Sequence, residues 1–174
     1  MKEALRSMTE DMMAMIRRKD FAPFNLALSG GETAKHMFSL WVDEYKDKID
    51  WNNIRFFWVD ERCVPPTSPD SNYGHANHLL FKPLRIPADI STGSRARTSR
   101  VPSDALFMGR KGILAVVQSN AYVRLHHPRV GEDSHTASIF PTTMELLSDS
   151  RNYAVSQQPS TGQYRITMTG PLIL

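Results

Sequence analysis

The sequence predicts an α/β protein with three layers, in which helices cover both faces of a mostly parallel sheet. Three observations support this. Segments with helical spacing of apolar residues alternate along the chain with short apolar runs of strand length. A pair of glycines follows the first of these runs, where a strand would turn into a helix. The second run is apolar almost throughout, as expected for a strand that is buried on both faces of a parallel sheet.

The first half of the chain contains the clearest elements. An amphipathic helix is indicated by Leu5, Met8, Met12, Met15 and Ile16. Residues 24–28 then form a short strand that stops at Ser29-Gly30-Gly31, and residues 33–41 again fit a helix. The second strand covers residues 54–59 and ends at Asp60-Glu61-Arg62. After a proline-rich loop, residues 71–81 lead into a further helix.

The second half is less regular. Residues 91–129 contain scattered serines and arginines and show no clear periodicity, and order returns at Gly131. We expect a helix around residues 144–147, strands at 153–155 and 165–169, and an apolar strand at the end of the chain, residues 171–174. Residues 1–174 are expected to form a single domain.

Composition limits the class of protein. A length of 174 residues with 41% hydrophobic and 22% charged residues fits one globular domain. No apolar run has the length of a membrane span, and the first residues do not resemble a targeting peptide, so we expect a cytoplasmic protein with no membrane partner. The single Cys63 excludes an internal disulfide. The sequence leaves the oligomeric state open.

The basic charge is concentrated in one segment. Residues 91–131 hold seven Lys and Arg side chains against one acid. This segment lacks the regular helix or aromatic platform that nucleic-acid binding usually requires, so no nucleic-acid partner is expected.

Residues suited to anion binding follow the predicted strands. Free backbone N–H groups around Gly30 and Gly31 can hold a phosphate, although a tight turn also explains the glycines. Arg62 offers a charge-assisted bond to a phosphate oxygen, and the alternative is a structural ion pair within Asp60-Glu61-Arg62. Arg165 is a second candidate anion ligand, or else an edge-strand arginine.

His135 is the candidate general base. It stands two residues after Asp133, which can orient its imidazole, and this arrangement suits proton transfer near neutral pH. The alternative is a surface histidine in a polar turn. No other histidine stands at zinc-ligand spacing, so no metal is expected.

Four segments in order resemble the 6-phosphogluconolactonase family, which shares a superfamily with glucosamine-6-phosphate deaminase. They are residues 26–33 (LALSGGET), residues 57–65 (FWVDERCVP) with Ser71-Asn72-Tyr73, residues 131–141 (GEDSHTASIFP) and residues 165–171 (RITMTGP). The resemblance implies the NagB/RpiA-like fold and hydrolysis of 6-phospho-D-glucono-1,5-lactone, a sugar phosphate lactone of the pentose phosphate pathway, without metal or organic cofactor. It also implies that the domain in residues 1–174 is truncated, or incomplete, at both ends, because the family has a strand before the first helix and further strands and helices after Leu174.

The resemblance also implies roles for individual residues. His135 would activate water with support from Asp133, and Asp60 matches an acid that shuttles a proton in the deaminase branch. The 6-phosphate would be held by Ser29, Gly30, Gly31, Thr33, Arg62 and Arg165. This phosphate is a remote anchor that orients the reacting ring.

Three other functions stay open. Deamination or isomerisation of amino-sugar phosphates is disfavoured because the deaminase pattern has a glutamate where this chain has Phe140. A non-catalytic sugar-phosphate sensor is disfavoured because no helix-turn-helix pattern precedes the domain. A degenerate homologue without function is the third alternative.

Ser134 departs from the family pattern, because the family has glycine at this position. If the backbone there has positive φ, the serine would destabilise the fold by about 1 kcal/mol.

The irregular segment 91–129 suggests a compensated pair of frameshifts. Residues 122–130, together with the bases that directly follow them, can be encoded by codons that read Met-Phe-Asp-Cys-Ile-Ile-Leu-Gly-Leu-Gly in a neighbouring frame. This is the apolar strand that the family has at this point. We predict that sequencing the gene reveals one single-base insertion and one deletion that together restore the family pattern. A reading frame that no such pair restores would refute this hypothesis.

Overall fold

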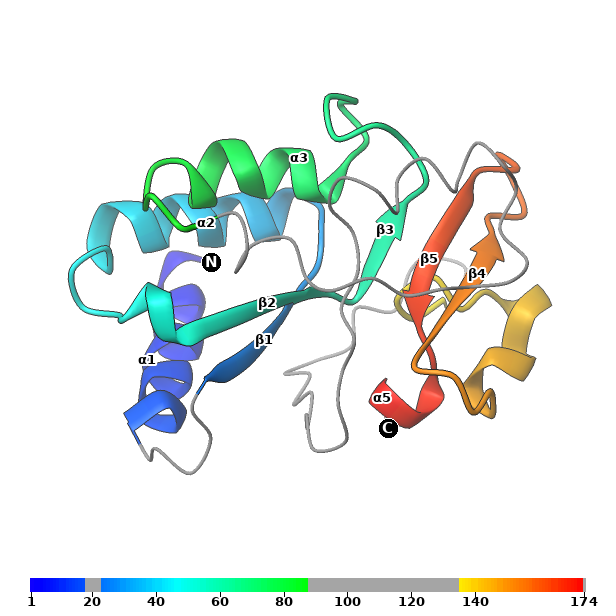
Figure 1. Ribbon diagram of the computed structural model, residues 1–174, viewed down its shortest axis with the longest axis horizontal. Coiled ribbons are helices and arrows are strands. Elements are labelled where there is room, and N and C mark those ends of the chain that lie inside the picture. Colours follow the sequence, from blue (N-terminus) through cyan, green and yellow to red (C-terminus); the bar gives the residue numbers. More distant parts are fainter. Residues whose placement is uncertain (18–22, 88–134, 174) are drawn as a thin grey trace.

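The computed structural model describes residues 1–17, 23–87 and 135–173, and its strands form two sheets (Figure 1). The first sheet is a parallel pair, β1 (Phe24–Leu28) with β2 (Ile54–Trp58). The second is antiparallel with the order β3-β5-β4 and consists of β3 (Asp60–Arg62), β4 (Tyr153–Gln157) and β5 (Tyr164–Met168). The α/β class is confirmed, and the parallel pairing holds for the first two strands.

The helices of the first half of the chain follow the predicted order. The helices are α1 (Lys2–Arg17), α2 (Glu32–Glu44), α3 (Asn72–Ala76), which continues as the π-helical turn η2 (Asn77–Phe81), and α5 (Gly170–Ile173). Two short 3-10 helices, η1 (Trp51–Asn53) and η4 (Pro141–Leu147), precede β2 and β4. The helix expected around residues 144–147 is therefore η4, which begins at a proline because proline suits the first turn of a helix.

The largest apolar core lies between the first sheet and the helices. Ile54 and Phe56 of β2 are almost completely buried, and the Phe56 ring lies 5.0 Å from the Phe81 ring. Side chains of α1, α2 and α3 all belong to this cluster. The described residues thus show two of the three expected layers. Phe57 faces the other way and packs in a second cluster with Tyr153 and Met168.

Val59 joins the two sheets. Its N–H donates to the Leu28 carbonyl at 2.8 Å, which extends the parallel pairing, and its own carbonyl accepts from the Met168 N–H at 2.8 Å. The sequence placed Asp60-Glu61-Arg62 at the end of the second strand, and the triplet does follow β2, but no further strand was expected at these residues. The triplet forms β3, because the chain that leaves the parallel sheet continues directly as the antiparallel partner of β5.

The predicted terminal strand at residues 171–174 is also wrong. Gly170–Ile173 form the helical turn α5, in which the Leu172 N–H donates to the Thr169 carbonyl at 3.0 Å. Pro171 has no N–H for a strand ladder. Gly170 packs against the backbone of Leu147, and a Cβ built on it would lie 1.8 Å from the Leu147 carbonyl oxygen. The whole of the irregular segment predicted at residues 91–129 lies outside the described residues.

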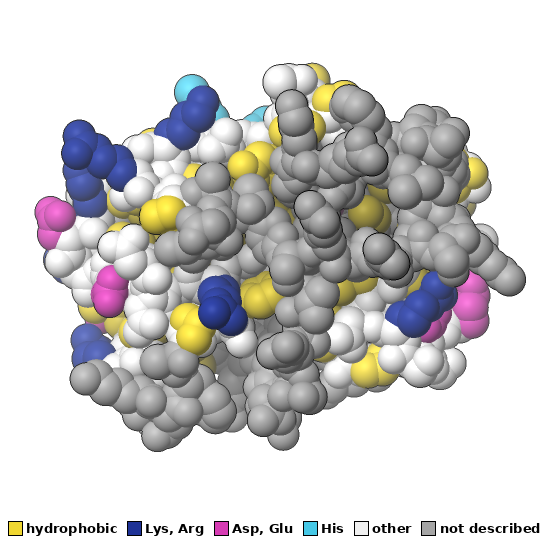
Figure 2. Space-filling view, in the orientation of Figure 1, with side chains coloured by type: hydrophobic (Ala, Val, Ile, Leu, Met, Phe, Trp, Pro, Cys, Tyr) yellow, Lys and Arg dark blue, Asp and Glu magenta, His cyan; other side chains and the backbone are white. Residues whose placement is uncertain are grey.

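The described Lys and Arg side chains form no single patch on the face in view (Figure 2). None of the described helices is long and apolar enough to cross a membrane. Lys and Arg side chains lie in separate small groups on the face shown in Figure 2, as far as the described residues extend.

A buried hydrogen-bond chain links α1 to α2 and yields a stability prediction. The Trp41 Nε1–H donates to Thr9 Oγ1 at 2.9 Å, and this hydroxyl donates to the Leu5 carbonyl at 2.8 Å. Thr9→Val preserves shape but leaves the indole N–H without this acceptor, so we expect the free energy of unfolding to fall by about 1–3 kcal/mol in urea titrations. Thr9→Ser keeps the hydroxyl and is the control. Equal losses in both variants would contradict the role of this bond.

Candidate functional site

The loop between β1 and α2 exposes its backbone. Gly31 has φ 90° and ψ 177°, a conformation that favours glycine, and it stands immediately before the first residue of α2. Ser29, Gly31 and Thr33 are exposed. Within the described residues no side chain caps this helix. Its first N–H groups and the positive end of its dipole are therefore suited to an anion.

Asn72 connects this loop to β3. A Cβ built on Gly30 would lie 1.9 Å from Asn72 Oδ1, so only glycine allows the approach. Asn72 Nδ2 donates to the Asp60 carbonyl at 3.0 Å. Asn72 Oδ1 is buried and has no hydrogen-bond partner among the described residues. Buried polar atoms without partners are rare, and at a candidate site they indicate a place that a ligand can complete.

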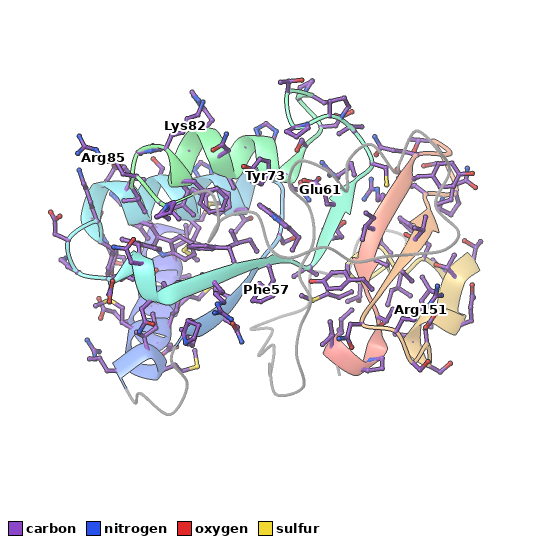
Figure 3. All side chains as sticks on the ribbon, in the orientation of Figure 1. Phe57, Glu61, Tyr73, Lys82, Arg85 and Arg151 are labelled. Carbon is purple, nitrogen blue, oxygen red and sulfur yellow. The ribbon has the colours of Figure 1, made fainter. Side chains whose placement is uncertain are left out.

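Glu61 holds the start of α3 against β3, as Figure 3 shows for its approach to Tyr73. Its carboxylate is buried and accepts the backbone N–H groups of Arg62 at 2.7 Å, Asn72 at 2.9 Å and Tyr73 at 2.7 Å. Burial raises the pKa of Glu61, and the three N–H donors act in the opposite direction. Glu61 is thus a structural anchor, and its strand neighbours Asp60 and Arg62 point to the opposite face of the sheet.

Arg62 and Arg165 lie directly opposite each other on β3 and β5. Opposed residues of an antiparallel pair share a face, and like charges in such a position are destabilising. Arg62 Nη1 donates to the Asp70 carbonyl at 2.7 Å, and Arg165 Nη2 donates to Gln158 Oε1 at 3.1 Å. Arg62 Nε is buried without a partner in the described part of the chain. Two arginines that share one sheet face in this way form a suitable site for a multiply charged anion.

Asp60 and Ser138 lie on the same side as the two arginines. Ser138 Oγ donates to Asp60 Oδ2 at 2.6 Å, and Arg165 Nη1 lies 3.7 Å from that oxygen. The Ser138 N–H donates to Thr167 Oγ1 at 3.0 Å. Asp60 is therefore paired with a guanidinium and a hydroxyl in a largely buried position.

His135 lies close to this group through Phe140. The imidazole and phenyl centroids are 5.1 Å apart, and Arg165 Cζ lies 5.8 Å from the same phenyl ring. Phe140 is completely buried. The candidate base and a candidate anion ligand thus share one aromatic neighbour.

The structure brings most of the predicted site residues into one connected region. Contacts lead from Gly30 through Asn72 to Asp60, and from Asp60 through Ser138 and Arg165 to Phe140 and His135. Asp133 lies outside the described residues. No role was predicted from the sequence for Asn72, Ser138, Gln158 or Thr167. Three of them, Asn72, Ser138 and Thr167, lie within the family-like segments, and this was the available signal.

Two other chemistries receive no support. Burial raises the pKa of the Cys63 thiol to about 11, so Cys63 is protonated near neutral pH and is a poor nucleophile. Within residues 1–17, 23–87 and 135–173, no group of three or more His, Cys, Asp or Glu side chains could hold a metal ion.

The chain is similar to known proteins over most of its length. The chain is 38% identical over 159 residues to 6-phosphogluconolactonase of Treponema pallidum and 37% identical over 153 residues to that of Haemophilus influenzae. These matches cover 85% and 87% of the chain but only 62% and 64% of those two relatives.

Solved structures show the same fold. The devB protein superposes with a TM-score of 0.73 at 32% identity, over 98% of this chain and 71% of the other. The 6-phosphogluconolactonase of Trypanosoma brucei gives a TM-score of 0.70 at 27% identity, over 99% and 73%. The family model for glucosamine-6-phosphate isomerases/6-phosphogluconolactonase matches residues 1–174, and the chain belongs to this family.

Proposed function

We propose that this chain provides the active site for hydrolysis of 6-phospho-D-glucono-1,5-lactone to 6-phosphogluconate. The observation that supports this most directly is the pair Arg62 and Arg165, opposed on one sheet face beside the turn that bears His135. An arginine pair suits the phosphate, and a histidine suits the proton transfer that lactone hydrolysis requires. Relatives in Treponema pallidum and Haemophilus influenzae bear the name of this enzyme.

The proposed reaction needs no cofactor. His135 accepts a proton from a water molecule as the water oxygen attacks the lactone carbonyl carbon, which gives a tetrahedral intermediate. The intermediate collapses when the C1–O5 bond breaks, and the ring oxygen takes the proton from His135 to become the C5 hydroxyl. The single product is the open-chain acid, which ionises to the carboxylate by releasing its carboxyl proton to water, with the 6-phosphate unchanged. Asp133 is proposed to orient His135.

In this proposal the glycine loop and the arginines act on the phosphate. Ser29, Gly30, Gly31 and Thr33 supply N–H and hydroxyl donors, and Arg62 with Arg165 supplies positive charge. Asp60 is held by Arg165 and Ser138 and keeps the guanidinium in place, which is a different role from a proton shuttle. Binding energy from the phosphate then serves to orient the distant carbonyl.

Deamination is the poorer proposal for this site. Phe140 stands where the deaminase pattern has a glutamate, and its ring is completely buried against His135. A phenyl ring can neither donate nor accept the proton that ring opening of an amino sugar requires.

Replacing the proposed base tests the chemistry. His135→Asn should lower kcat on freshly prepared 6-phosphogluconolactone by about 10²- to 10⁴-fold, because the general base is lost. Spontaneous hydrolysis must be subtracted, and affinity for 6-phosphogluconate measured by calorimetry should stay within about threefold because the phosphate ligands are intact. Unchanged turnover would refute the role of His135.

Replacing an arginine tests the anchor. Arg62→Gln should reduce kcat/KM by about 10- to 100-fold, because a charge-assisted bond contributes about 1.5–3 kcal/mol. Arg55→Gln is the matched control, since Arg55 is exposed on β2 away from the site. Equal effects of both substitutions would indicate a general charge effect and contradict a specific phosphate contact.

A further inference from the structure

We propose that Ser138 is a positioning residue that fixes the turn bearing His135 relative to the arginine pair. The inference rests on the proposed function, because it concerns what holds His135, the proposed base, at a fixed distance from the arginines proposed to bind the phosphate. Ser138 is completely buried. Its partners come from β3 and β5, whereas Ser138 itself lies in the connection between His135 and η4.

Three polar contacts hold Ser138. Its hydroxyl donates to Asp60 Oδ2 at 2.6 Å, a short bond of the charge-assisted kind. Arg165 Nη1 lies 3.5 Å from the same hydroxyl oxygen. The backbone N–H donates to Thr167 Oγ1 at 3.0 Å. Because Asp60 and Thr167 are register partners on β3 and β5, the serine binds both strands at one level of the sheet.

The turn itself is strained next to Ser138. Ala137 has φ 55°, in the left-handed region that costs a non-glycine residue about 1–2 kcal/mol. Thr136 and Ile139 close the turn with two backbone hydrogen bonds, of 3.3 Å and 2.9 Å. A strained conformation persists only where its surroundings hold it, and the contacts of Ser138 provide such restraint.

The contacts around Ser138 predict that removing its hydroxyl impairs catalysis but not phosphate binding. Arg165 also contacts Gln158 and Asp60, and Arg62 contacts the Asp70 carbonyl, so both guanidinium groups keep partners when the Ser138 hydroxyl is removed. The turn loses its charge-assisted bond to β3. A displacement of about 1 Å between base and substrate costs about 10²-fold in rate. The loss therefore appears in kcat, while affinity for the phosphate is retained.

The test combines kinetics, binding and NMR on the full chain. Ser138→Ala should lower kcat on 6-phosphogluconolactone by about 10- to 100-fold. Affinity for 6-phosphogluconate should stay within about threefold. The His135 ring proton resonances should move toward those of an exposed histidine, because the contact between the His135 and Phe140 rings loosens. Ser148→Ala, at the end of η4, is the matched control and should change none of these.

A second variant covers the case in which Ser138→Ala fails to fold. Thr167→Val is nearly isosteric and removes the acceptor of the Ser138 N–H, so it should shift the same His135 resonances and lower kcat in the same direction. Unchanged kcat and resonances, or a loss of 6-phosphogluconate affinity as large as the loss of kcat, would overturn the proposal. If the unaltered chain does not hydrolyse the lactone, the proposed function fails, and the resonances and the affinity still decide the role of Ser138.

Discussion

The described structure depends on one constraint, which is that the backbone of Val59 belongs to both sheets. Its N–H completes the parallel pairing with β1, and its carbonyl begins the antiparallel pairing with β5. The strand that leaves the apolar core therefore enters the polar site without a loop. Because side chains alternate along this path, Glu61 faces α3 while Asp60 and Arg62 face the side on which Ser138 lies.

The same constraint explains why the site tolerates an unfavourable charge arrangement. The register that Val59 imposes sets Arg62 against Arg165, although like charges opposed in a sheet are destabilising. Asp60 and Gln158 partly compensate Arg165, and the Asp70 carbonyl accepts from Arg62. The left-handed Ala137 lies in the same region. Local costs of this kind are typical of binding sites, where the arrangement that suits the ligand differs from the one that suits the free protein.

Much of the fold could be predicted because it follows from local pattern. The periodicity of apolar residues over 5–16 indicates an amphipathic helix, and the apolar run at residues 54–58 indicates a buried strand. Asp60–Arg62 could not be recognised as a strand, since three polar residues carry no such signal and their pairing depends on β5, more than 100 positions later. The helical turn at Gly170–Ile173 was missed because Leu172 and Ile173 are equally suited to a strand.

The sequence by itself determined most of the helices and strands, the glycine loop and the residue types of the site, because these depend on neighbours within a few positions and on recurrent motifs. Only the tertiary structure decided that Arg62 faces Arg165, that Asn72 packs on Gly30, and that Ser138 binds Asp60 across 78 positions of sequence. Strand register and buried hydrogen bonds join residues that are distant in the chain. Which residues pair in this way depends on the packing of the whole domain, and no local sequence pattern predicts it.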